Sequence, residues 1–214
     1  MKLERFFGPE AQARVAQAVR QAEASSTGQI VPVVVERSAR YLEVRWLGAV
    51  LLMALVTALA ETLRLGVTVR ELPFLQLAAG IAGALLARLP PVERLLAGKR
   101  EMEQATRARA LRAFQERDLH HTEKGTGVLV FASLLEHRAW VVGDHGIHSK
   151  MGEGEWERAV QALIGGIQRG DPASGFCDAI AIVGARLAEH FPRGPAQGAG
   201  PGNELPDRLV QEKD

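Results

Sequence analysis

The pattern of apolar and polar positions predicts soluble helices and strands on either side of a strongly apolar central region. Apolar residues recur at helical spacing over residues 9–25, where Pro9 suits the opening position of a helix. Residues 29–36 contain a run of β-branched side chains and predict a strand. Because Pro32 has no N–H to donate, we expect this strand to lie at a sheet edge or to be irregular there.

Two uncharged runs dominate residues 46–89. The first covers residues 47–60, and the second covers residues 72–87 with Gln76 as its one strongly polar residue. A spanning helix needs about 20 apolar residues, and each run is shorter than that. Together they predict a two-helix transmembrane hairpin. The alternative is two buried helices of a soluble core, but a chain of 214 residues has little material to enclose two helices that are apolar all round.

The basic residues around this hairpin predict its orientation. The connection between the two runs carries Arg64 and Arg70 alone, whereas the flanks carry Arg37, Arg40, Arg45, Arg88, Arg94, Lys99 and Arg100. Cytoplasmic segments next to spanning helices are enriched in Lys and Arg. We therefore expect a cell-membrane protein with two spans, with both soluble parts on the cytoplasmic side.

The region after the hairpin predicts a charged helix, a strand pair and two further helices. Residues 92–118 carry many arginines, which form either a solvated face or a contact with anionic lipid headgroups. Residues 126–135 and 138–144 predict two antiparallel strands joined by a tight turn at Glu136 and His137. Apolar residues over 156–167 and 175–191 recur at helical spacing, and Gly170 ends the first of these patterns.

This order of elements predicts an α/β (α+β) sandwich, in which a small mixed sheet is flanked by helices and interrupted by the hairpin. Residues 1–45 supply the first helix and strand, which are too little to fold alone. Residues 46–89 form the hairpin, and residues 90–192 complete the sheet. Residues 193–214 are polar and rich in Pro and Gly, and predict a disordered tail.

Composition and motifs exclude several functions. The formal net charge of +1 gives no reason to expect a nucleic-acid partner, and a single cysteine, Cys177, forms no intrachain disulfide. Cys177 lies in an apolar helical pattern, which favours a small core residue over a reactive thiol. The chain has no Gly-rich phosphate loop with a lysine, no CxxC pair and no HExxH motif. Ser133 and Cys177 have no base beside them in sequence.

The loop after the third predicted strand is the best candidate for a metal site. Asp144, His145 and His148 lie close together there, and further candidate ligands are His120, His121 and Glu136. Carboxylates favour a hard divalent cation such as calcium, and imidazoles favour a transition metal. A metal-bound water would then support hydrolysis. The alternative is that Asp144 caps the turn and the histidines are exposed.

Several segments resemble the TPM domain family, most closely its bacterial membrane branch. They are residues 119–122 (LHHT), 126–136 (TGVLVFASLLE), 144–147 (DHGI), 27–35 (TGQIVPVVV), 190–192 (HFP) and 203–207 (NELPD). The resemblance implies a small sheet flanked by helices. It also implies a phosphatase-like, metal-binding or accessory role, since members of the family are described in each of these ways. Gln29 stands where the family commonly has Glu.

The expected function is that of a membrane-anchored accessory or scaffold factor, with the lipid bilayer and another membrane protein as its partners. A metal-dependent phosphatase-like hydrolase, and a metal-binding regulatory domain without turnover, are the alternatives. The residues alone do not decide whether the protein is an enzyme.

Overall fold

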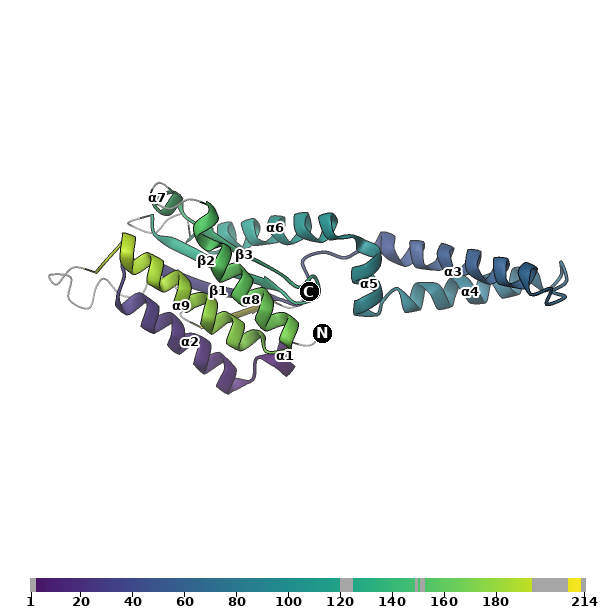
Figure 1. Cartoon of the computed structure of the whole chain (residues 1–214), viewed down its shortest axis with the longest axis horizontal. Coiled ribbons are helices and arrows are strands. Elements are labelled where there is room, and N and C mark those ends of the chain that lie inside the picture. The colour runs from purple at the N-terminus through teal and green to yellow at the C-terminus, as the bar shows by residue number, and fades with distance from the viewer. Residues whose placement is uncertain (1–2, 120–124, 149, 151–152, 194–207, 213–214) are drawn as a thin grey trace. The chain divides into compact units, whose positions relative to one another are not determined.

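The computed structural model describes residues 3–119, 125–148, 150, 153–193 and 208–212 (Figure 1). The chain divides into two compact units. The first combines Met1–Ser38 with Glu103–Asp214, and the second is Ala39–Met102.

A four-stranded mixed sheet forms the centre of the first unit. Its strands are β1 (Gln29–Val35), β2 (Gly127–Ser133), β3 (Arg138–Gly143) and β4 (Val210–Glu212), in the order β3-β2-β1-β4. β1 is parallel to β2 and β4, and β2 is antiparallel to β3. The prediction of a mixed sheet with flanking helices is confirmed. The direct pairing of β1 with β2 places the strand before the apolar region and the strand after it side by side.

Pro32 lies in an interior strand of the sheet, but at a point where only one side of that strand is paired. The N–H groups of successive strand residues point to opposite sides. The N–H of Gln29 donates toward β2, and the N–H of Ile30 donates to the Glu23 carboxylate at 2.8 Å on the other side. The nitrogen of Pro32 therefore faces away from β2, and β4 pairs with β1 only from Val33 onward. The missing donor thus falls on a stretch of β1 that has no strand beside it.

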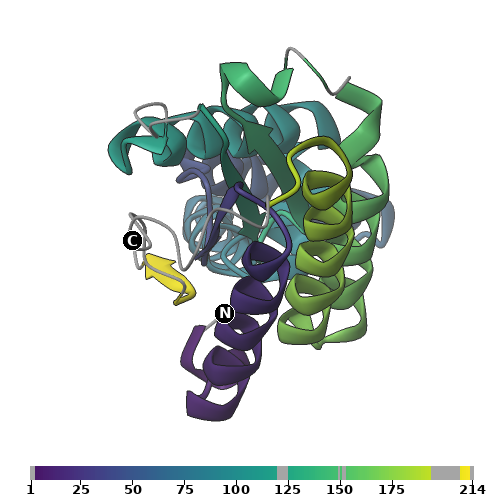
Figure 2. The same ribbon diagram turned by 90° about the vertical axis from the view of Figure 1, so that its left-hand side faces the viewer.

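Three helices cover one face of the sheet: α2 (Pro9–Ala24), α8 (Glu157–Arg169) and α9 (Pro172–His190) (Figure 2). A short helix, α1 (Leu3–Phe6), precedes them, and the ring of Phe7 meets that of Phe176 edge-on at 5.9 Å. Gly170 ends α8 in the left-handed conformation, as its sequence predicted, and Asp171 begins α9 by accepting a hydrogen bond from the N–H of Ser174.

The other face of the sheet packs against α6 (Lys99–Glu116), through Ala110, Ala113 and Phe114. The sequence predicted one helix over residues 92–118, but α5 (Pro90–Ala97) and α6 are separate elements. Gly98 lies between them with φ of 75°, a conformation that favours glycine and ends a helix. Leu111, also on α6, is exposed and does not belong to the cluster that packs on this face.

The end of the chain forms a strand, so the prediction of a disordered tail is wrong for residues 209–212. β4 pairs with Val33, Val34 and Val35 of β1, and Leu209 is buried in the core. The segment escaped prediction because three paired residues are too few to produce a recognisable alternation of apolar and polar positions. Residues 194–207 lie outside the described part of the chain.

The second unit contains a helical hairpin. α3 (Leu42–Thr62) and α4 (Leu72–Leu86) pack together, and α5 also contacts α3. The two helices approach closely at Gly48 and Gly83. A Cβ on Gly83 would lie 2.3 Å from the carbonyl oxygen of Gly48, so no larger residue fits there without separating the helices.

Only one of these helices is long and apolar enough to cross a membrane by itself. α3 meets that requirement, whereas α4 meets it only in combination with α5, from which it is bent by 95°. The 15 residues of α4 cover about 22 Å at 1.5 Å per residue, against a hydrocarbon core of about 30 Å. The structure therefore supports the predicted hairpin of helices but not two full spans.

We expect Gly83→Val to separate α3 from α4 and to lower the midpoint of thermal unfolding of the hairpin. Overpacking of this kind typically costs about 1–3 kcal/mol. The measurement is loss of helical circular dichroism on heating in a mild detergent. Gly80→Val is the matched control on the same helix, because its added Cβ would meet only the flexible side chain of Met53. Equal destabilisation by both variants would contradict the assigned contact.

Candidate functional site

Asp144 closes the end of the β2–β3 pair and is largely buried. Its N–H donates to the carbonyl of Gly127 at 2.9 Å, and its carboxylate accepts from the N–H of His145 at 2.6 Å. Its own carbonyl accepts from the N–H of Ile147 at the end of the next turn. These bonds position the short helix α7 (His145–His148) directly after β3. The alternative role of Asp144, capping the turn, is therefore visible in the structure.

The proposed metal ligands are only partly described. The side chain of His145 is exposed, whereas the side chain of His148 and the residues His120 and His121 lie outside the described part of the chain. Within the described residues, no three His, Cys, Asp or Glu side chains are grouped so that they could hold a metal ion. Metal binding at Asp144, His145 and His148 stays a prediction.

Glu136, the other predicted ligand, lies in the turn before β3, whereas Asp144 follows the same strand. A strand rises about 3.3 Å per residue, which separates the two by roughly 20 Å. Glu136 is buried, and its carboxylate accepts from the N–H of Ser38 at 2.9 Å and from the hydroxyl of Ser133. It therefore ties the segment after β1 to the turn after β2, and does not share a site with Asp144.

A groove with a volume of about 500 Å³ lies between β3, α6 and α8. Its lining includes Trp140 and Trp156, and the guanidinium of Arg107 stands 5.6 Å from the centre of the Trp140 ring.

β3 pairs with β2 alone among the described strands. The backbone N–H groups of successive strand residues point to opposite sides, and that of Asp144 donates toward β2. The backbone groups of Ala139 and Val141, which are an odd number of positions away, therefore point away from β2 toward the open edge. Trp and Arg are the residue types most enriched at the centres of protein–protein contacts.

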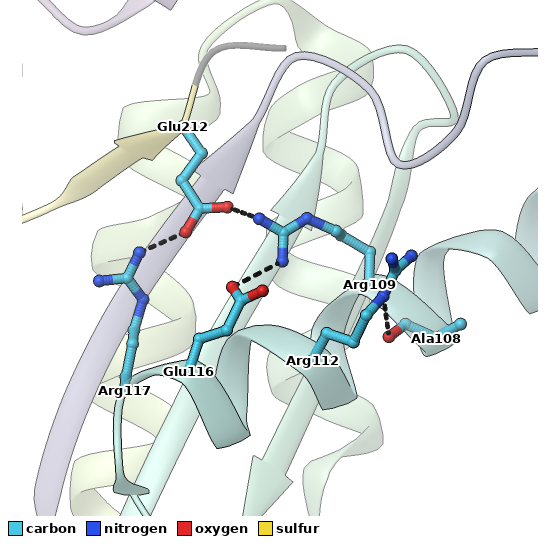
Figure 3. Close-up of polar contacts among 6 residues, drawn as sticks. All are labelled: Ala108, Arg109, Arg112, Glu116, Arg117 and Glu212. Carbon is cyan, nitrogen blue, oxygen red and sulfur yellow. Dashed lines mark hydrogen bonds and ion pairs between the residues drawn. The ribbon is translucent and has the colours of Figure 1, made fainter.

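A cluster of charges joins α6 to the last strand (Figure 3). Arg109 and Arg117 both donate to the carboxylate of Glu212, and Arg109 also pairs with Glu116 at 3.1 Å. Arg112 does not take part, since its Nε is bonded to the carbonyl of Ala108 on its own helix. The sequence indicated a solvated or lipid-facing role for all these arginines. It gave no sign that two of them bind a residue about a hundred positions away.

Cys177 is unsuited to nucleophilic chemistry near neutral pH. Partial burial raises the pKa of its thiol; the positive charge of Arg14 opposes this in part, and the carboxylates of Asp178 and Asp171 raise the pKa further. The thiolate is the nucleophilic form of cysteine, and a raised pKa makes that form scarce. The side chain also packs against the core, which agrees with the predicted structural role.

We expect Glu136→Ala to lower the free energy of unfolding by about 2–4 kcal/mol. The substitution leaves the buried donors of Ser38 and Ser133 without their acceptor, and each such loss costs about 1–3 kcal/mol. Denaturant unfolding of the purified chain measures the change. Glu157→Ala, at an exposed position, should stay within about 0.5 kcal/mol of the parent chain. A neutral Glu136→Ala would exclude the structural role.

Comparison with known proteins identifies the fold but not a family. No protein-family model matches the chain, and no curated protein matches it. The NMR structure of the BA42 protein from the psychrophilic bacterium Bizionia argentinensis is similar, with a TM-score of 0.60 over 99% of this chain and 99% of that chain. The two sequences are 18% identical, so the likeness shows a shared fold alone.

Proposed function

We propose that the protein is a membrane-anchored accessory or scaffold factor for another membrane protein. The observation that carries this proposal is the distribution of exposed apolar side chains. Among the described residues, every exposed large apolar side chain except Leu111 lies between Leu42 and Leu95. The first unit therefore resembles an ordinary soluble domain, whereas the second presents apolar side chains on the outside of its helices.

The exposed apolar surface of α3 is difficult to reconcile with water as its surroundings. In its most apolar 18-residue window, only 11% of the residues are buried. Burial of apolar surface contributes roughly 25 cal/mol per Å², and soluble proteins rarely expose continuous apolar patches larger than a few hundred Å². A helix of 21 residues is about 32 Å long, enough to cross the hydrocarbon core. The length of α3 and its exposed apolar surface support the anchoring role.

The shorter helices fit a hairpin that enters the bilayer and returns to the same side. Gly48, near the start of α3, lies beside Gly83, near the end of α4, so the two helices run in opposite directions. α5 then turns by 95° and exposes 79% of Leu95. In the proposed arrangement α5 lies along the membrane surface with this side chain among the acyl chains. Local thinning of the bilayer accommodates the shorter α4.

Accessory binding suits the first unit better than catalysis does. Its described residues combine a groove lined by two tryptophans with the open edge of β3, which are features of a surface that holds another chain. The resemblance to the TPM domain family supports the same role, because some members are described as accessory factors for membrane protein complexes. The basic flanks of the hairpin favour a cytoplasmic position for this unit.

We expect the full chain to remain in the membrane fraction after a high-salt and alkaline wash. Leu51→Asp combined with Leu55→Asp should release most of it, since each Asp costs about 2.5–3.5 kcal/mol at the centre of a spanning helix. Leu111→Asp is the control, because it places an Asp on the one large exposed apolar residue among the described residues of the first unit. A parent chain that washes off completely would refute the anchor.

The orientation has its own test. In a Cys177→Ala background, Val69→Cys places a thiol in the connection between α3 and α4, where the side chain is 89% exposed. A membrane-impermeant maleimide should label this thiol in intact cells, whereas a C-terminal reporter should be active only in the cytoplasm. Labelling of the Val69→Cys variant only after the cells are opened would place the connection inside the cell and would contradict the proposed topology.

A further inference from the structure

The last strand of the sheet is attached differently from the other three. β4 pairs with only three residues of β1, and all three of its own residues are partly exposed. It is joined to α9 by a run of residues rich in Pro and Gly, at positions 193–208. Elements with few buried contacts open more readily than the core of a domain. β4 is therefore the strand whose release from β1 breaks the fewest backbone pairings of the sheet.

The contacts of β4 specify the kind of segment that fits there. Successive side chains alternate between the two faces of the sheet: Leu209 is buried among the residues that pack with α2 and α9, and Val210 packs on the α6 side. Gln211 donates to the carbonyl of Phe7, and Glu212 returns to the α6 side. The position therefore accepts an extended chain with two apolar residues, then a polar one, then an acidic one.

Charge complementarity fixes the acidic position. Arg109 and Arg117 both donate to Glu212, and their side chains are about one-fifth exposed. The Nε of Arg117 is buried and has no partner among the described residues, so Glu212 is the acceptor that holds this guanidinium there. Partly exposed ion pairs of this kind add little stability but set the register and charge of the segment that binds.

We propose that the edge of β1 at Val33–Val35, together with Arg109 and Arg117, is a docking site for an extended acidic segment of a partner protein. The chain's own β4 occupies this site and is displaced when the partner adds its strand. The accessory role proposed above identifies the partner as the assisted membrane protein. The docking site itself is independent of the anchor, and its test is performed in detergent.

The test uses a fluorescent peptide with the sequence of residues 208–212 (RLVQE) and blocked ends, so that its glutamate is the one carboxylate. Added to the full-length wild-type chain, it should accelerate hydrogen exchange at the amides of Val210–Glu212, because it displaces them. A Glu212→Gln chain holds its own strand less firmly and should bind the peptide about fivefold more tightly, as expected for loss of an exposed ion-pair contact. A peptide with Gln in place of Glu should bind at least about fivefold more weakly.

A control variant separates docking from general charge effects. Arg112→Ala removes an arginine of the same helix that does not touch Glu212, and it should leave peptide binding unchanged. Unchanged exchange of β4 in the presence of excess peptide, or equal binding of the Glu and Gln peptides, would overturn the proposal. A stable dimer in which copies exchange β4 would overturn the choice of a partner protein as occupant.

Discussion

The parallel pairing of β1 with β2 is the interaction on which the rest of the structure depends. It joins the segment before the apolar region to the segment after it, and both helical layers pack on the surface that these two strands form. Neither part has enough strands to be stable alone. The insertion between them is compatible with this pairing because it is a hairpin of antiparallel helices. Gly48 and Gly83, in contact near its open end, bring the chain back close to where it left.

The elements that could be predicted from sequence are those whose pattern repeats over many residues. The β-branched run of β1, the strands on either side of Glu136 and the glycine that ends α8 each carry a local signal. β4 carries none, since its pairing depends on a partner strand far away in the chain. Gly98 lies inside the single helix that the sequence predicted over residues 92–118, and its positive φ marks the break between α5 and α6.

The candidate site was harder to predict than the fold. Glu136 and Asp144 are eight positions apart, and their closeness in sequence suggested a shared site, but an intervening strand places them at opposite ends. Arg109, Arg112 and Arg117 look alike in sequence, and only the tertiary structure distinguishes the two that bind Glu212 from the one that does not. Both edges of the sheet carry features suited to extended chains: an open strand beside a groove at β3, and a short, charge-held strand at β4.

The position of the helical hairpin between β1 and β2 also imposes an order of events during synthesis. β1 leaves the ribosome as a run of apolar, β-branched residues, and its first partner strand begins only at Gly127. At about 5–20 residues per second, β1 waits roughly 5–20 s for that partner. The apolar hairpin emerges during this interval, before the sheet can close. Folding of the first unit therefore cannot finish until the whole apolar hairpin has been synthesised, and a delay in β2 prolongs the time for which the apolar strand β1 is unpaired.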